Sequence, residues 1–274
     1  VEGGKHLGFA RFRADPEDSN PGRRRRWVAE ARRARRRGLG SALLDAAGGS
    51  AAAGGATEFL ASTSLVEPDG LAVALARGFI EVDGEVEMHL DLTGGSDEPF
   101  APGPAAGWYV AGLAALRPAE RDWLDRYHRL YTSLAAGVLW ASHAAPPDRE
   151  AFRRTHVEAP GFLLEGTAVA VLDGEWVGLS ELWRSGDDRA TAYQELTGVL
   201  PAHRRRGIAT ALVAVTADWA RRHGYRRLLA STGVENEAMR AVLLRLGFRE
   251  VARWSYLLGP AQGRCVLSGQ EVQV

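Results

Sequence analysis

Apolar and polar positions in the second half of the chain follow strand and helix periods in turn. In the stretch 206–223, apolar residues return at Ile208, Leu212, Val215 and Trp219, a spacing that predicts an amphipathic helix. Runs rich in apolar, β-branched or aromatic residues predict strands. The expected strands cover 108–113, 162–172, 175–184, 189–200, 227–231 and 248–258. The expected helices cover 118–136, 147–157, 206–223 and 235–246.

Glycine and proline residues mark where these elements begin and end. Asp173-Gly174 predicts a tight hairpin between two strands. Gly224 and Gly247 follow the last residues of two predicted helices. Pro201 closes the strand 189–200, because proline cannot extend a central strand. The order strand, helix, helix, three strands, helix, strand, helix, strand predicts an α/β protein.

The chain also contains an internal repeat, and the two copies lie 169 positions apart without a gap over much of their length. The second-copy positions are Gly207, Leu212, Gly224, Ala230-Ser231-Thr232, Gly247-Phe248 and Glu250-Val251. Their first-copy counterparts are Gly38, Leu43, Gly55, Ala61-Ser62-Thr63, Gly78-Phe79 and Glu81-Val82. Two copies of this length indicate duplicated domains rather than a solenoid. We expect a partial, degenerate domain at 1–92, a linker at 93–107, a complete domain at 108–260 and a C-terminal tail at 261–274.

The first copy looks weaker than the second. It has no counterpart of the opening strand and helices of the second copy, so we expect it to be incomplete at its N-terminus. The basic run Pro21 to Arg26 predicts a poor strand in which only Trp27-Val28-Ala29 can pair. The helix that follows is expected to carry Gly48, Gly49, Gly54 and Gly55, and each glycine inside a helix costs about 1 kcal/mol relative to alanine. We expect a structural copy; contact of the basic run with nucleic acid is disfavoured, since no aromatic platform accompanies it.

The strand-to-helix loop around Gly207 predicts an anion site. The first amides of a helix lack partners and lie at the positive end of its dipole. Gly207 allows the backbone to approach a ligand closely, and neighbouring arginines add positive charge. Phosphate or pyrophosphate is the expected ligand. No Lys-Ser/Thr follows the glycine, and no Gly-x-Gly-x-x-Gly occurs, so a nucleoside triphosphatase or a dinucleotide fold is not indicated.

The pattern Arg204-x-x-Gly207-x-Ala209, entered through Val199-x-Pro201, resembles the acetyl-CoA loop of the GCN5-related N-acetyltransferases. The strand 228–232 and the sequence Asn236-x-x-Met239, which leads to Leu246-Gly247-Phe248, extend the resemblance. It covers residues 108–260 fully and 1–92 in part. The resemblance implies a tandem acyl-CoA N-acyltransferase fold, with a mixed central sheet flanked by helices, and acetyl-CoA as acyl donor.

The resemblance also assigns roles to residues of the loop and its strand. Backbone groups of three strand residues would pair with the pantetheine amides, and the amides of six loop residues would hold the pyrophosphate. The strand residues are Thr197, Gly198 and Val199; the loop residues are Arg205, Arg206, Gly207, Ile208, Ala209 and Thr210. Asn236 would bind the pantetheine arm, although a helix N-terminal role suits it too. Glu67 stands at this position in the first copy and would repel an anionic cofactor, so we expect one acetyl-CoA per chain.

Catalytic groups are less well defined. Many family members place a tyrosine acid at the position of Leu243, so the general acid is left open between Tyr256, Tyr193 and water. Glu195 is the candidate base, because strand parity predicts that it shares a face with Tyr193 and Thr197. An ion pair with an arginine is an equal alternative for Glu195.

The resemblance implies an N-acetyltransferase that moves the acetyl group to a primary amine by direct attack in a ternary complex. We expect the acceptor to be a small molecule. The alternatives are a non-catalytic CoA-binding or scaffolding protein that retains the fold, and a protein or peptide N-acetyltransferase. The sequence leaves a homodimer open.

Composition narrows the partners. The 34 basic and 34 acidic residues give no net charge that would argue for nucleic acid or a membrane. No apolar run reaches the roughly 18 residues of a membrane span, and no signal-peptide pattern begins the chain, so a cytoplasmic location is expected. Lys5 is the only lysine, which suggests a GC-rich bacterial genome. Cys265 is the only cysteine and the histidines show no ligand spacing, so no metal is expected.

Overall fold

A computed structural model describes residues 7–14, 20–66, 69–94, 107–136, 148–186 and 188–261. Glu67, Cys265 and most of the expected linker and tail lie outside these ranges. The described chain divides into two compact units. Unit 1 holds the residues up to Glu85 and those from Ala252 onward, and unit 2 holds those from Val86 to Val251. Each boundary falls within the last strand of a repeat, so the units do not follow the sequence division at 92 and 108.

Unit 2 contains a mixed sheet in the order β4-β9-β8-β7-β6-β5. The strands are β5 (Trp108–Gly112), β6 (Ala168–Leu172), β7 (Glu175–Arg184), β8 (Thr191–Val199), β9 (Arg227–Gly233) and the end of β4 (Ile80–Asp91). Strands β5 to β8 pair in antiparallel fashion, whereas β8 and β9 are parallel. Asp173 and Gly174 both have positive φ, at 50° and 82°, as the expected β6–β7 hairpin turn requires. The predicted mixed α/β fold is confirmed.

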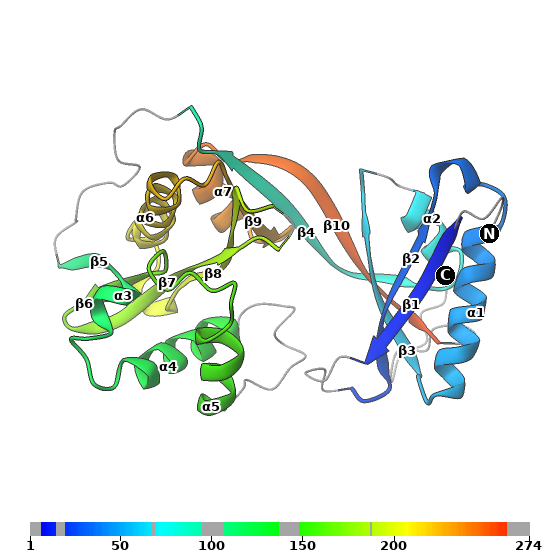
Figure 1. Ribbon diagram of the computed structural model, residues 1–274, viewed down its shortest axis with the longest axis horizontal. Helices are drawn as coiled ribbons and strands as arrows, with labels where there is room; N and C mark the ends of the chain where they lie inside the picture. The colour runs from blue at the N-terminus through cyan, green and yellow to red at the C-terminus, as the bar shows by residue number, and fades with distance from the viewer. Residues whose placement is uncertain are drawn as a thin grey trace. The chain divides into compact units, whose positions relative to one another are not determined.

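Helices cover both faces of this sheet (Figure 1). They are α3 (Leu113–Leu116), α4 (Trp123–Ala135), α5 (Arg149–Phe152), a π-helical turn η3 (Arg153–Val157), η4 (Pro201–His203), α6 (Ile208–Arg222) and α7 (Glu237–Arg245). Helix α6 lies on one face, and α4 and α5 lie on the other. Two glycines show why these helices can approach closely. A Cβ on Gly178 would lie 3.0 Å from Leu212 of α6, and one on Gly198 would lie 3.1 Å from Leu134 of α4.

Unit 1 repeats the second half of this arrangement. Its strands follow the order β1-β2-β3-β10. They are β1 (Gly8–Ala14), β2 (Arg23–Glu30), β3 (Glu58–Ser64) and the end of β10 (Arg249–Pro260). Its helices are η1 (Arg32–Ala34), α1 (Leu39–Ala53) and α2 (Asp69–Leu75). The loops before α1 and α6 share one conformation, with φ of 62° and 77° at Arg36 and Gly38 and of 63° and 79° at Arg205 and Gly207.

The expectation that only Trp27-Val28-Ala29 would pair is wrong. Strand β2 is eight residues long and pairs with β1 from Arg24 to Glu30. Two of its arginines have side-chain partners. Arg23 bonds Glu58 at 2.7 Å, and Arg26 lies against two phenylalanine rings. Backbone pairing of a strand does not depend on apolar side chains when its charged side chains have such partners.

Helix α1 also forms despite its glycines, and at 15 residues it is as long as α6. A Cβ on Gly48 would lie 2.8 Å from the carbonyl oxygen of Ala261, so this glycine permits close packing. No helix among the described ranges is long and apolar enough to cross a membrane.

Candidate active site

The loop between β8 and α6 has the open geometry expected of an anion site. Gly207 begins α6 as its N-cap with φ of 79°, and no side chain caps the helix there. A Cβ placed on Gly207 would meet nothing within 4 Å. Arg204 fixes the loop, because its Nε donates to the carbonyl of Val199 at 3.0 Å. The side chain of Ile208 is buried, so this residue offers a ligand only its backbone.

Strand β8 carries a bulge immediately before this loop. Ser180 of β7 lies opposite Thr197, but Leu182 lies opposite Gln194. Two residues of β8, Glu195 and Leu196, therefore stand opposite one residue of β7. Such a bulge bends the strand and redirects side chains.

The bulge corrects the predicted parity of the strand. Gln194 Nε2 donates to Thr197 Oγ1 at 3.0 Å and to Ser180 Oγ at 2.7 Å, so Thr197 shares a face with Gln194. Tyr193 and Glu195 instead line one pocket together. The expectation that Thr197 lies on their face is wrong, because the extra residue shifts the alternation by one.

Beyond the bulge, β8 separates from β9. The parallel pairing runs from Thr191 with Arg227 to Gln194 with Ala230, whereas β8 continues to Val199 and β9 to Gly233. In the continuous described range 188–261, the second half of β8 thus has no ladder partner on that side. An extended amide-containing chain could add to such an edge.

Asn236 caps helix α7. Its Oδ1 accepts a hydrogen bond from the amide of Met239 at 3.2 Å, and the residue is exposed. The helix N-terminal role is confirmed, and the role toward pantetheine stays a prediction. Leu243 is buried in the core and offers no proton.

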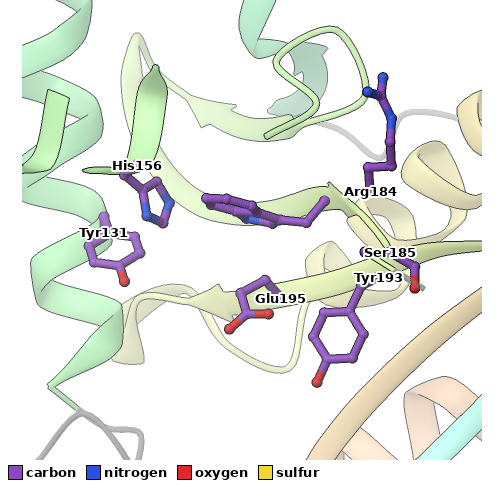
Figure 2. Close-up of a pocket in the computed structure, with 8 residues that line it drawn as sticks. Tyr131, His156, Arg184, Ser185, Tyr193 and Glu195 are labelled. Atoms are coloured by element: carbon purple, nitrogen blue, oxygen red, sulfur yellow. The ribbon is translucent and has the colours of Figure 1, made fainter. Parts of the chain in front are cut away.

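A pocket of about 450 Å³ opens over the bulge of β8 (Figure 2). Its lining residues are Tyr131, His156, Trp183, Arg184, Ser185, Gly186, Tyr193 and Glu195. Figure 2 shows Tyr131 and His156 on one side, with Glu195 and Tyr193 projecting from the strand on the other. Aromatic walls with one carboxylate suit a cationic guest. Of the sequence-predicted catalytic candidates, the structure brings Glu195 and Tyr193 together here.

His156 belongs to this pocket and was missed by the sequence analysis. It lies on the π-helical turn η3, an irregularity that often occurs at functional sites. Its Nε2 lies 3.1 Å from each carboxylate oxygen of Glu181, whose side chain is completely buried. No other described residue bonds its Nδ1. A histidine held through one nitrogen by a carboxylate presents the other in a fixed direction.

Tyr127 completes this arrangement. Its hydroxyl donates to Glu181 Oε1 at 2.5 Å. Burial, followed by the charge of Glu181, raises the pKa of Tyr127 well above its usual value, so the phenol stays protonated and keeps donating. Spacing alone gave no sign of this group, because its members come from α4, η3 and β7.

Tyr256, one of the open candidates for the general acid, lies in unit 1. Its hydroxyl donates to Glu85 Oε2 at 2.6 Å, and it pairs across the sheet with Ser62. It is not among the residues that line the unit 2 pocket.

The loop before α1 differs from its counterpart in one respect. The carboxylate of Glu30 lies against Gly40, so closely that a Cβ on Gly40 would overlap it. The equivalent positions in unit 2 are Val199 and Ala209. Glu30 therefore places a negative charge beside the helix N-terminus of unit 1, and this charge opposes an anionic ligand there.

A group of three or more residues able to hold a metal ion does not occur within the described ranges. The residues present instead offer backbone amides, a carboxylate, an imidazole and aromatic rings. This donor set suits an anionic cofactor and an amine.

Comparisons with known proteins agree with this architecture. The model of the acetyltransferase (GNAT) family matches residues 120–248. Aminoglycoside N(6')-acetyltransferase type 1 of Salmonella enteritidis is 31% identical over 139 residues, which cover 50% of this chain and 93% of that protein. The enzyme of the same name from Salmonella typhimurium is 27% identical over 139 residues, with the same coverage of 50% and 93%.

Two solved structures share the fold over nearly the whole chain. A GCN5-related N-acetyltransferase from Sphaerobacter thermophilus has a TM-score of 0.72 at 16% identity, covering 96% of this chain and 80% of that one. A tandem GNAT protein of the clavulanic acid biosynthesis pathway has a TM-score of 0.69 at 22% identity, covering 97% and 82%. The predicted tandem fold and N-acetyltransferase class are confirmed, and the chain belongs to the GCN5-related N-acetyltransferase superfamily.

Proposed function

We propose that this protein transfers the acetyl group of acetyl-CoA to a primary amine of a small molecule, and that both substrates meet in unit 2. The observation that carries the proposal is the bulged strand β8. Its residue Glu195 lines the aromatic pocket, and its end at Val199 leads into the open loop before α6. One strand thus links an amine pocket to an anion site.

Acetyl-CoA supplies an activated thioester and an anionic pyrophosphate. We assign the pyrophosphate to the backbone amides of Arg205, Arg206, Gly207, Ile208, Ala209 and Thr210. The uncapped N-terminus of α6 and the space at Gly207 support this assignment. Backbone groups of Thr197, Gly198 and Val199 would pair with the pantetheine amides, since β8 has separated from β9 there. Asn236 would reach the pantetheine arm with its amide group while its Oδ1 caps α7.

An ammonium ion must lose a proton before its nitrogen can attack the thioester. Glu195 is the proposed acceptor of this proton, directly or through a water. The C–N bond then forms as the C–S bond breaks, and the leaving thiolate takes up a proton. Leu243 is buried and apolar, so the proton that the thiolate takes up comes from Tyr193 or from water.

His156 is proposed to act beside Glu195. The amine nitrogen releases two protons as it changes from ammonium to amide. Glu195 is proposed to accept one of them, so a second group in the pocket can accept the other. Nε2 of His156 is directed at Glu181, and Nδ1 is the nitrogen left for the substrate. The carboxylate of Glu181 holds the imidazole in one tautomer and orientation, so that Nδ1 is the nitrogen that takes a proton.

The acceptor class rests on two kinds of support. The pocket combines aromatic walls with Glu195, which suits a small cation. The relatives that cover half of this chain are named for acetylation of aminoglycosides at the 6' nitrogen. We therefore propose an amine of this kind, a polyhydroxylated or ring-bearing primary amine, as the acceptor.

A panel of amines tests the proposal through release of free CoA. The panel contains aminoglycosides, polyamines, amino acids and peptides with free N-termini. We expect turnover with one or more small amines and its loss in Glu195→Gln. Acetylation of peptides alone would support a protein N-acetyltransferase instead. Binding of acetyl-CoA without turnover of any amine would support a non-catalytic CoA-binding protein.

A further inference from the structure

Unit 1 contains a buried cation that the acetyl transfer does not use. Arg26, from the basic run of the sequence, is only 7% exposed. Its guanidinium lies 4.3 Å from the ring centre of Phe59 and 4.5 Å from that of Phe79. Contacts with aromatic rings involve the flat faces of a guanidinium, so the N–H groups at its edge remain available to hydrogen-bond acceptors.

These N–H groups have no acceptor among the residues that the structure describes. No carboxylate, carbonyl or hydroxyl of that part of the chain bonds Arg26, which lines a cavity instead. Burial and the nearby charge of Arg77 lower the pKa of Arg26 to about 10, and Asp45 opposes this shift. A guanidinium without a bonded anion, facing a cavity, favours an anionic partner.

The side chain opens on a cavity of about 310 Å³ inside unit 1. Arg77 lines the same cavity, and its Nε lies 3.6 Å from Asp45, whose side chain is 74% exposed. Two guanidinium groups thus face one solvated carboxylate, which leaves the cavity positive. Gly48 and Gly49 of α1 form part of its wall and keep it free of side chains.

The position of Arg26 is not occupied by a cation in unit 2. The parallel pairing begins with Arg23 and Glu58 in unit 1 and with Thr191 and Arg227 in unit 2. Arg26 and Gln194 each lie three residues after the first paired residue of their strand, so the two positions correspond. Gln194 is bonded to Ser180 and Thr197, and no cation stands in its place. The cationic lining is therefore a property of the first copy, and none of its residues belongs to the proposed cofactor or acceptor site.

We propose that unit 1 binds a small oxyanion in this cavity, a carboxylate or a phosphate. The N–H edge of Arg26 recognises two of its oxygens, and Arg77 supplies a second positive charge. Guanidinium groups pair with both kinds of oxyanion in this bidentate way. The first copy then serves as a ligand-binding module rather than only as a structural support.

Calorimetric titration of the full chain carrying Gly207→Glu tests the proposal, because this background suppresses anion binding at the loop of unit 2. Sodium phosphate and sodium succinate are titrated separately at constant ionic strength, which distinguishes a phosphate from a carboxylate ligand. We expect saturable binding of one anion per chain for at least one of the two. Arg26→Met should weaken it about tenfold or more, as loss of charge-assisted hydrogen bonds predicts.

Three further variants make the result decisive. Arg26→Lys keeps the charge but loses the planar edge, so it should weaken binding of the anion. This variant keeps the test usable if Arg26→Met fails to fold. Arg77→Met should weaken it less, and Arg245→Met, an exposed arginine of α7, should leave it unchanged. Absence of saturable binding for both anions, or equal affinity in the parent and Arg26→Lys, would overturn the proposal and leave Arg26 with a packing role.

Discussion

The imidazole Nε2 of His156 lies 3.1 Å from both carboxylate oxygens of Glu181, a residue with no exposed surface. A carboxylate in this position fixes the tautomer and the orientation of the ring. The hydroxyl of Tyr127 donates to the same carboxylate, at Oε1. The pocket over β8 therefore holds one carboxylate in contact with solvent, Glu195, and one imidazole supported from the interior.

Replacing Glu181 by glutamine tests the support of His156. The variant keeps the shape of the side chain but removes the carboxylate that orients the imidazole. We expect kcat to fall roughly 10- to 100-fold, as for other residues that orient a catalytic or ligating histidine. The KM for acetyl-CoA should not change, since the loop at Gly207 is untouched. If the affinity for acetyl-CoA, measured by calorimetry, fell by as large a factor as kcat, Glu181 would have a general structural role instead.

Glu195→Gln tests the carboxylate itself. Loss of a general base costs about 10²- to 10⁴-fold in rate, and we expect kcat/KM for the amine to fall in that range. Calorimetric affinity for acetyl-CoA should stay within about twofold of the parent protein. Glu175→Gln, at an exposed carboxylate of β7, serves as the matched control and should leave the rate unchanged. Full activity of Glu195→Gln would assign the base role to another group.

The buried phenol of Tyr127 predicts a dependence of stability on alkaline pH. Its pKa is raised in the folded protein above the ordinary value of 10.0, chiefly by burial. The unfolded chain therefore releases this proton first, and stability is lost as pH rises above about 10. In Tyr127→Phe this contribution is absent, so the melting temperature should fall less steeply between about pH 9 and 11. Parallel curves for the two proteins would contradict the assignment.

Gly259 predicts a local stability effect in unit 1. A Cβ at this position would overlap the ring of Phe79. We expect Gly259→Ala to lower the free energy of unfolding by roughly 1–3 kcal/mol, the usual cost of overpacking a core. Gly94→Ala is the control, because a Cβ there would meet nothing within 4 Å. Denaturant unfolding of the two variants measures the difference, and an equal effect in both would argue against this packing.

The sequence predicted the elements of unit 2 well because their periods and turn residues are unambiguous. The Asp173-Gly174 hairpin and the helix that follows Gly207 occur where the pattern placed them. The opening helix was expected from residue 118, but α4 begins at Trp123. Local propensity fixes where such elements lie more firmly than where they end.

The details of the site depend on contacts that the sequence pattern does not encode. The bulge at Glu195 and Leu196 adds one residue to β8, so strict alternation placed Thr197 on the wrong face. His156 and Glu181 are brought together by packing between η3 and β7. Strand β2 was underestimated because the partners of its arginines, such as Glu58, are distant in sequence.

The central claim is that one acetyl-CoA binds each chain, at the loop before α6. Calorimetric titration of acetyl-CoA into the parent protein, Gly38→Glu and Gly207→Glu measures it directly. Both glycines have positive φ and open space around them, so the two substitutions impose similar backbone strain and the same charge. We predict one site per chain in the parent and in Gly38→Glu, and no binding in Gly207→Glu. Two sites per chain in the parent, one of them lost in each variant, would contradict the account, as would binding that Gly207→Glu leaves unchanged.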